Sequence, residues 1–154
     1  MNENQTMLLV DDSEDDLSLM KHACHAARFR ATLHTVNSGE EAIAYLSGEG
    51  AYADRGKFPL PVVMVLDLNM PRENGFEVLA WVRAQPGLKR LAVIVLTASS
   101  RPEDVEMAFD SGASSYLVKP ATMAALIAMI CCLRDWLEYN HFPPLFQEPA
   151  RVQS

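Results

Sequence analysis

The sequence has no hydrophobic run long enough to cross a membrane. Its longest uncharged apolar stretch extends from Pro120 to Leu133, whereas a bilayer-spanning helix needs roughly 18 residues. We therefore expect this stretch to form a buried helix. Residues 1–6 also lack the basic start and apolar core of a signal peptide. The sequence thus predicts a cytoplasmic protein without a membrane partner.

Basic residues are scarce. The chain has 13 Lys and Arg against 20 Asp and Glu, which gives a net charge of -7. A surface of this sign repels nucleic acid, because the phosphate backbone is recognised mainly by Lys and Arg. We expect no nucleic-acid partner.

Cysteines are few and odd in number. Cys24, Cys131 and Cys132 lie in apolar helical stretches without the spacing of a disulfide framework or a zinc ribbon, so they are expected to be reduced core residues. A metal site built from His22, Cys24 and His25 is the alternative, but it lacks a convergent fourth ligand.

The length and composition predict one domain. A chain of 154 residues that is 49% hydrophobic can build one well-buried core but not two ordinary domains. We expect an N-terminal tail over 1–6, a domain over 7–139 and a C-terminal extension over 140–154. The extension is rich in proline and has no periodicity, which is typical of disorder.

Short aliphatic and β-branched runs alternate with helical segments, which predicts a parallel sheet in a (βα)5 α/β fold. The run Ala31–Val36 mixes polar with apolar residues and is therefore expected at a sheet edge. The five predicted strands are Met7–Val10, Ala31–Val36, Val62–Leu66, Ala92–Leu96 and Ser114–Val118.

Start and stop signals bound the helices. Ser13 and Ser38 are predicted N-caps, the latter in a capping box with Glu41, and Gly112 is expected to end the fourth helix. Between the second helix and the third strand lies a long connection, 47–61, rich in Gly and Pro. The predicted helices are Glu14–Phe29, a segment after Ser38, Gly75–Gln85, Glu103–Ser111 and Thr122–Tyr139.

Polar residues follow four of the strands: Asp11 and Asp12, Asp67, Thr97 and Lys119. The carboxyl ends of parallel strands meet in one crevice, so these side chains are expected to be neighbours. Taken singly, each has a structural explanation as a helix cap, a turn residue or a solvated charge. Four complementary strand ends together favour a site.

The chemistry of this set points to phosphoryl transfer. Clustered carboxylates repel one another unless a cation lies among them, and oxygen ligands with room for water suit Mg²⁺. Lys119 adds a positive charge that the metal alone would not need but a phosphoryl group would. Asp67 is then the expected nucleophile, with the Thr97 hydroxyl and Lys119 stabilising the transferring group.

The motifs resemble those of two-component receiver domains over about 7–139. They are Val10-Asp11-Asp12, Leu66-Asp67-Leu68-Asn69-Met70-Pro71 with Gly75 after it, Leu96-Thr97-Ala98, and Tyr116-Leu117-Val118-Lys119-Pro120. The resemblance implies a doubly wound, flavodoxin-like receiver fold with a five-stranded parallel sheet in the order 2-1-3-4-5.

The resemblance also implies roles. Asp67 matches the phosphoacceptor, while the side chains of Asp12 and Asp67 and the carbonyl of Asn69 match the Mg²⁺ ligands, with Asp11 acting through a metal-bound water. Thr97 and Lys119 match the phosphate contacts. In such domains Thr97 and Tyr116 move together as a switch, and the bond between Lys119 and Pro120 is typically cis.

As a receiver, the chain would take its phosphoryl group from a sensor histidine kinase. The long loop before the third strand, the Trp-containing last helix and the Pro-rich extension are most similar to small response regulators of phytochrome-type kinases. No output domain follows Tyr139, so we expect a stand-alone relay. The last helix is apolar on more than one face, which predicts a homodimer through the last strand and helix.

Two other functions are possible. A haloacid-dehalogenase-like phosphatase also uses an aspartyl nucleophile, but position 69 is Asn rather than Asp and no cap domain is present. A phosphorylation-independent pseudo-receiver would have no electrostatic reason to keep the acidic cluster with Thr97 and Lys119. We therefore expect a phosphoacceptor signalling domain, which catalyses its own phosphotransfer and slow dephosphorylation, rather than an enzyme that turns over a separate substrate.

Overall fold

The sheet has the predicted topology. The computed structural model describes residues 4–70 and 74–145, so Pro71, residues 1–3 and the extension over 146–154 lie outside the described residues. Within the described chain, five parallel strands form one sheet in the order β2-β1-β3-β4-β5. The strands are β1 (Thr6–Val10), β2 (Thr32–Val36), β3 (Val63–Leu66), β4 (Ala92–Thr97) and β5 (Ser115–Val118). This order confirms the doubly wound fold and places β2 at an edge.

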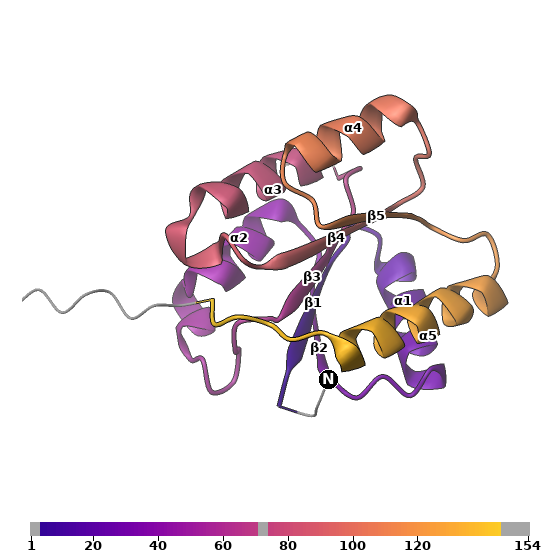
Figure 1. Cartoon of the computed structure of the whole chain (residues 1–154). Coiled ribbons are helices and arrows are strands. Elements are labelled where there is room, and N and C mark those ends of the chain that lie inside the picture. The colour runs from indigo at the N-terminus through magenta and orange to yellow at the C-terminus, as the bar shows by residue number, and fades with distance from the viewer. Residues whose placement is uncertain (1–3, 71–73, 146–154) are drawn as a thin grey trace, which may run out of the picture.

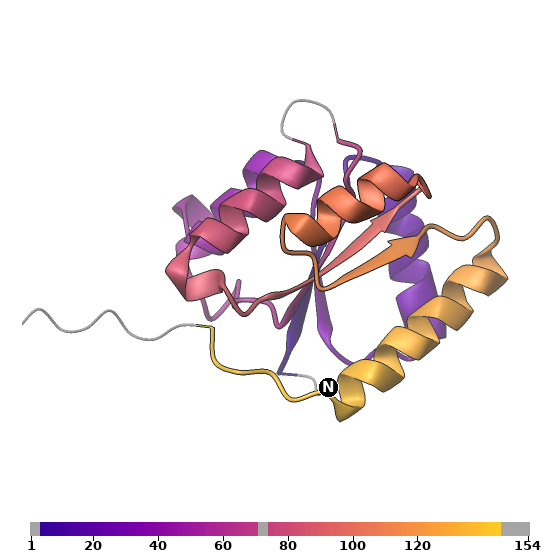
Figure 2. The ribbon, with the colours of Figure 1, turned by 45° about the horizontal axis from the view of Figure 1, so that its top comes forward.

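Helices cover both faces of the sheet (Figures 1 and 2). They are α1 (Glu14–Ala26), α2 (Gly39–Ser47), α3 (Gly75–Ala84), α4 (Pro102–Asp110) and α5 (Met123–Tyr139). Met7 and Leu9 face the core under α1 and α5, whereas Leu8 and Val10 face the core under α2 and α3. Because successive strand residues point to opposite faces, β1, which is apolar from Met7 to Val10, is buried on both sides.

Side-chain caps begin four of the helices. Ser13, Ser38, Asn74 and Thr122 each accept a hydrogen bond from a backbone N–H in the first turn, which satisfies a donor that has no partner within the helix. The Ser13 and Ser38 caps confirm the prediction. The Glu41 carboxylate accepts from the N–H of Asn37 rather than from that of Ser38, so the predicted capping box is incomplete.

Helix α1 ends at Ala26, three residues before the predicted end. The chain turns at Arg28, which has a left-handed φ of 55°. Its N–H still reaches the carbonyl of His25, while the Arg134 guanidinium of α5 donates to the carbonyl of Ala27. The left-handed residue ends the helix before the last turn that the sequence predicted, and the Arg134 contact adds a tertiary bond at this end.

The long connection 47–61 is a packed loop. It contains a short 3-10 helix, η1 (Gly50–Ala53), and is held by Arg55. The Arg55 guanidinium donates to the carbonyls of Tyr45 at 2.7 Å, Leu46 at 2.9 Å and Phe58 at 3.2 Å. It thereby joins the last turn of α2 to the loop, since the Tyr45 and Leu46 carbonyls belong to α2 and the Phe58 carbonyl to the loop.

The prediction for the cysteines is correct for Cys24 and wrong for Cys132. All three thiols are free, but only Cys24 is buried, whereas Cys131 is partly buried and Cys132 is exposed. Burial raises the pKa of the Cys24 thiol to about 12, which keeps it protonated and unreactive. Cys132 is exposed because it lies outside the apolar stripe of α5 that packs on the sheet.

Helix α5 is buried along one stripe rather than all round. Leu126, Ile130, Leu133 and Leu137 pack into the core, while the Trp136 side chain is half exposed. The buried helix predicted over Pro120–Leu133 is therefore correct only in part, because α5 begins at Met123 and only Leu126, Ile130 and Leu133 of this stretch are buried. Among the helices within residues 4–70 and 74–145, none combines the length and apolar character that a bilayer crossing requires.

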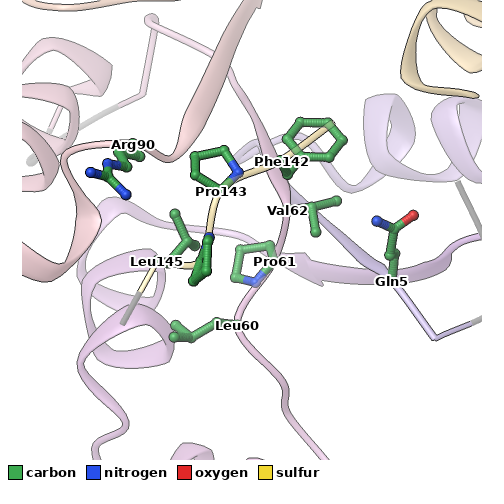
Figure 3. A pocket seen from close by; sticks show the side chains of 9 residues that line it. Gln5, Leu60, Pro61, Val62, Arg90, Phe142, Pro143 and Leu145 are labelled. Atoms are coloured by element: carbon green, nitrogen blue, oxygen red, sulfur yellow. The ribbon is translucent and has the colours of Figure 1, made fainter. Parts of the chain in front are cut away.

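The described part of the extension packs against the sheet. After α5, residues 140–145 pass along the amino-terminal ends of the strands toward the α2 side (Figure 1). Phe142 contacts the core under α5, and Leu145 contacts the core under α2 and α3. Between the extension and the sheet lies a pocket of about 350 Å³, shown in Figure 3 and lined by Gln5, Leu60, Pro61, Val62, Arg90, Phe142, Pro143, Pro144 and Leu145.

Candidate functional site

The sheet register brings the strand-end residues together as predicted. Val10 is paired with Leu66 and Thr97 with Val118, so the residues that follow β1, β3 and β5 leave the sheet at the same edge. Backbone hydrogen bonds continue the ladder at this edge. The Asp67 N–H donates to the carbonyl of Val10 at 3.0 Å, and the Lys119 N–H donates to the carbonyl of Thr97 at 2.8 Å.

Three carboxylates cluster at this edge. Ligand oxygens of Asp11, Asp12 and Asp67 all lie within 4.8 Å of one another. Asp11 and Asp67 are buried, and Asp12 is exposed. Carboxylate oxygens are ligands that hard divalent cations prefer. Because Asp12 is exposed, water can reach the site as a further ligand.

The pKa of Asp11 reflects the burial of the cluster. Desolvation raises the pKa of Asp11, and the negative charge of Asp67 raises it further, although hydrogen bonds from Lys119 and from the N–H of Ser13 act in the opposite direction. The raised pKa means that burial disfavours the ionised form of Asp11. A cation among the carboxylates would favour that form, and the oxygen donors fit a divalent metal.

Lys119 is the centre of the charge network. Its ammonium group donates to one oxygen each of Asp11 at 2.8 Å, Asp16 at 2.7 Å and Asp67 at 3.0 Å. Burial alone would lower the pKa of Lys119, but the three hydrogen bonds outweigh it and raise the pKa above its usual value. Lys119 therefore stays positively charged beside Asp67.

The loop after β3 orients Asp67. The Oδ1 atom of Asp67 accepts from the backbone N–H of Asn69 at 3.1 Å, and Oδ2 faces Lys119. The loop returns closely on itself, because a Cβ at Gly75 would lie only 2.4 Å from the carbonyl oxygen of Asp67. Only glycine fits at this start of α3, which explains why Gly75 follows the aspartate.

Thr97 and Tyr116 occupy neighbouring strands. Thr97 is fully buried at the end of β4, and its hydroxyl accepts from the side-chain amide of Asn69 at 3.2 Å. The partly buried ring of Tyr116 contacts the small core that contains Val95, and its hydroxyl donates to the carbonyl of Ser99 at 2.9 Å. Thr97 is therefore linked to the loop after β3, and Tyr116 to the loop between β4 and α4.

The cis bond that is typical of receiver domains is not found between Lys119 and Pro120. No peptide bond within the described residues is cis, so the bond between Lys119 and Pro120 is trans. The lysine nevertheless reaches the carboxylates, because the backbone bond to Thr97 fixes the end of β5 at the edge of the crevice.

Sequence reasoning missed Asp16. The acidic run Glu14, Asp15 and Asp16 in the first turn of α1 reads as a favourable charge at a helix N-terminus. Asp16 nevertheless makes the shortest of the three contacts to Lys119. The one available signal was helical spacing: Asp16 lies one turn before the buried Met20, on the side of α1 that faces the protein.

The fold and the site define a response regulator receiver: a doubly wound sheet with an acidic cluster, a buried threonine and a lysine at the carboxyl edge of its strands. The family model of the response regulator receiver domain matches residues 7–131. The chain belongs to this family.

Known relatives cover nearly the whole chain. Response regulator Rcp1 of Synechocystis sp. is 33% identical over 143 residues, which are 92% of this chain and 95% of Rcp1. The crystal structure of the phosphorylated cyanobacterial phytochrome response regulator RcpA has a TM-score of 0.82 at 33% identity and covers 90% of this chain and 98% of RcpA. The Mn²⁺-bound form of Rcp1 has a TM-score of 0.79 at 33% identity, with 90% and 99% covered.

Proposed function

We propose that the chain accepts a phosphoryl group on Asp67 from the phosphohistidine of a sensor histidine kinase, with Mg²⁺, and that this modification changes a protein-interaction surface. The observation that carries the proposal is the contact of the Lys119 ammonium with Asp67 inside the cluster of three carboxylates. A cation fixed beside a buried nucleophile is what the attack of one anion on another requires.

In the proposed reaction, a carboxylate oxygen of Asp67 attacks phosphorus as the phosphorus–nitrogen bond of the donor breaks, and the bonding electron pair stays on the imidazole. The product is an acyl phosphate. Lys119 and the Thr97 hydroxyl neutralise or bind the phosphoryl oxygens, and the N–H of Asn69 holds Asp67 in place. Slow attack of water on the acyl phosphate would restore the carboxylate.

Asp12, Asp67 and the Asn69 carbonyl would hold the Mg²⁺, with Asp11 acting through a bound water. The metal supplies positive charge to the transferring group and its nucleophile. The relative Rcp1 has been crystallised in a Mn²⁺-bound form. A divalent metal bound to a relative of this chain supports the assignment.

The kinase is proposed to be phytochrome-type. This finer assignment is supported by the relative RcpA, which is described as a cyanobacterial phytochrome response regulator and matches over 98% of its own length. Its structure was solved in the phosphorylated form, so phosphorylation is compatible with this fold.

The switch is proposed to couple Thr97 with Tyr116. A phosphoryl group on Asp67 adds acceptor oxygens that can draw the Thr97 hydroxyl toward the site. Thr97 would then leave its contact with Asn69, and the Tyr116 ring could move into the vacated space, which breaks its bond to Ser99. The surface of α4, β5 and α5 would change as a result.

The output surface is proposed to bind a second copy of the chain through β5 and α5. Strand β5 is the other edge of the sheet, and beside it lies an apolar groove of about 430 Å³. The exposed Val118 and Trp136 belong to the same two elements. The groove is lined by Ile94, Ser114, Ser115, Leu117, Met129, Cys132, Leu133 and Trp136. Unpaired strand edges and apolar patches favour such association.

The proposal is tested by incubating the purified protein with Mg²⁺ and acetyl phosphate or phosphoramidate. Intact mass and hydrodynamic size are compared for the wild type and Asp67→Asn. A hydroxylamine-labile gain of one phosphoryl group that is absent in Asp67→Asn is the expected result, and a larger hydrodynamic size on phosphorylation supports dimerisation as the output. If the wild type forms no adduct and does not respond to beryllofluoride, the chain is a phosphorylation-independent binding module instead.

A further inference from the structure

Asp16 differs from the other two carboxylates that contact Lys119. Asp11 and Asp67 belong to the cluster whose oxygens converge within 4.8 Å, together with Asp12, whereas Asp16 does not. Asp16 comes from the first turn of α1 rather than from a strand end. It contacts the ammonium at 2.7 Å across a sequence separation of 103 residues. Asp16 is thus linked to the carboxylate cluster through Lys119.

We propose that Asp16 is a positioning residue for Lys119. Asp16 holds the Lys119 ammonium at the mouth of the crevice when the metal and the phosphoryl group engage Asp11 and Asp67. This inference rests on the proposed phosphorylation of Asp67.

The hydrogen-bonding capacity of the ammonium supports this role. A lysine ammonium has three donors, and here each is directed to one carboxylate. The metal would engage Asp67 directly and Asp11 through a bound water. A phosphoryl group on Asp67 would accept one of the hydrogen bonds that Lys119 donates. The contact with Asp16 can persist through both changes, because Asp16 neither binds the metal nor accepts the phosphoryl group. The long, flexible lysine side chain then keeps a fixed partner.

The exposure of these groups limits the size of the effect. The Asp16 side chain is 38% exposed, against 10% for Asp11 and 7% for Asp67. An ion pair open to solvent is screened and contributes modestly. The expected role is therefore to tune the position of Lys119 rather than to supply its charge.

A pure charge effect of Asp16 would change the phosphorylation rate in the opposite direction to a positioning effect. A negative charge near the phosphoryl group weakens anion binding, so an Asp16 that acted only through its charge would slow phosphorylation. Its removal would then speed the reaction. The positioning role requires the reverse.

The test uses the full chain with Mg²⁺. The rate of phosphorylation by acetyl phosphate is followed by intact mass, and the affinity for beryllofluoride is followed by fluorine NMR. Asp16→Ala is expected to lower both by about fivefold. Asp16→Asn keeps an acceptor oxygen and is expected to recover part of the loss. Asp15→Ala removes the same charge from the same helical turn at an exposed position and is expected to change both by less than about twofold.

A double-mutant cycle separates positioning from a general effect on the helix. In the Lys119→Ala background, Asp16→Ala is expected to cost less than about twofold, because the side chain through which it acts is gone. The inference is overturned if Asp16→Ala leaves the wild-type rate unchanged or raises it, if Asp15→Ala has the same effect, or if the loss persists without Lys119. A wild-type protein that forms no adduct overturns the proposed function itself, and this inference with it.

Discussion

Arg83 of α3 and Gly112, which follows α4, are in close contact. The Arg83 Nε atom donates to the carbonyl of Gly112 at 2.8 Å, while its Nη1 donates to the carbonyls of Leu91 at 2.8 Å and Lys89 at 3.0 Å. Arg83 therefore joins the turn that ends α4 to the segment that precedes β4. Both connections precede strands, whereas the carboxylate cluster follows them, so we expect Arg83 to contribute to stability rather than to chemistry.

Gly112→Ala is expected to destabilise the fold by about 2 kcal/mol. Gly112 has a φ of 102°, and a Cβ there would lie 2.7 Å from the Cγ atom of Arg83. Urea unfolding measures the change. Gly56→Ala is a matched control, since its φ is ordinary and its new Cβ would meet only the tip of the Asp54 side chain at 3.2 Å. Equal losses in both variants would contradict this explanation.

Gly75→Ala is expected to slow phosphorylation of Asp67 by at least about tenfold, in addition to destabilising the fold. A Cβ at Gly75 would lie 2.4 Å from the carbonyl oxygen of Asp67 and 2.6 Å from the Cα of Leu68, so the loop that carries Asp67, the proposed nucleophile, must shift. The rate with acetyl phosphate is compared with that of Gly112→Ala, which is expected to remain near the wild-type value while the protein is folded. Similar rates for the two variants would show that the loop tolerates the shift.

Mg²⁺ is expected to raise the melting temperature of the wild type, because a ligand that binds only the folded state stabilises it. At a hundred times the Kd, the gain is about 2.7 kcal/mol. Asp12→Asn is expected to remove most of this gain with little effect on the metal-free protein, since Asp12 is exposed. Glu14→Gln is a matched control at an exposed neighbouring position. A gain that survives in Asp12→Asn would place the metal elsewhere.

His34 is expected to make folding less favourable in mild acid. Burial against the rings of Tyr45 and Phe58 lowers the pKa of His34 below its usual 6.5. The unfolded chain therefore binds a proton more readily than the folded one, and the free energy of unfolding decreases as the pH falls below about 6.5. His34→Gln is expected to reduce this slope in urea titrations at several pH values. His22→Gln, at an exposed position on α1, should leave it unchanged.

Much of the fold could be predicted because its signals are local. Apolar runs ended by Asp11, Asp67, Thr97 and Lys119 indicate both the strands and the edge at which they end, since parallel strands bring their carboxyl ends together whatever the details of packing. The caps at Ser13 and Ser38 are local in the same sense. The polar residues of the second strand predict an edge position, because they do not tolerate burial on both faces, and β2 lies at an edge.

The remaining features depend on contacts between distant segments. Asp16 looks like a helix-terminal charge until the fold brings the first turn of α1 to Lys119, the residue that follows β5. Helix α1 ends at Ala26, where Arg134 contacts the Ala27 carbonyl, and Cys132 is exposed because only one stripe of α5 meets the sheet. The sequence by itself determined the alternation of strands and helices and the polar residues that end the strands, because both are local patterns, whereas the strand order followed from the resemblance to receiver domains. Only the tertiary structure decided which side chains meet across it, because those distances depend on how the helices pack.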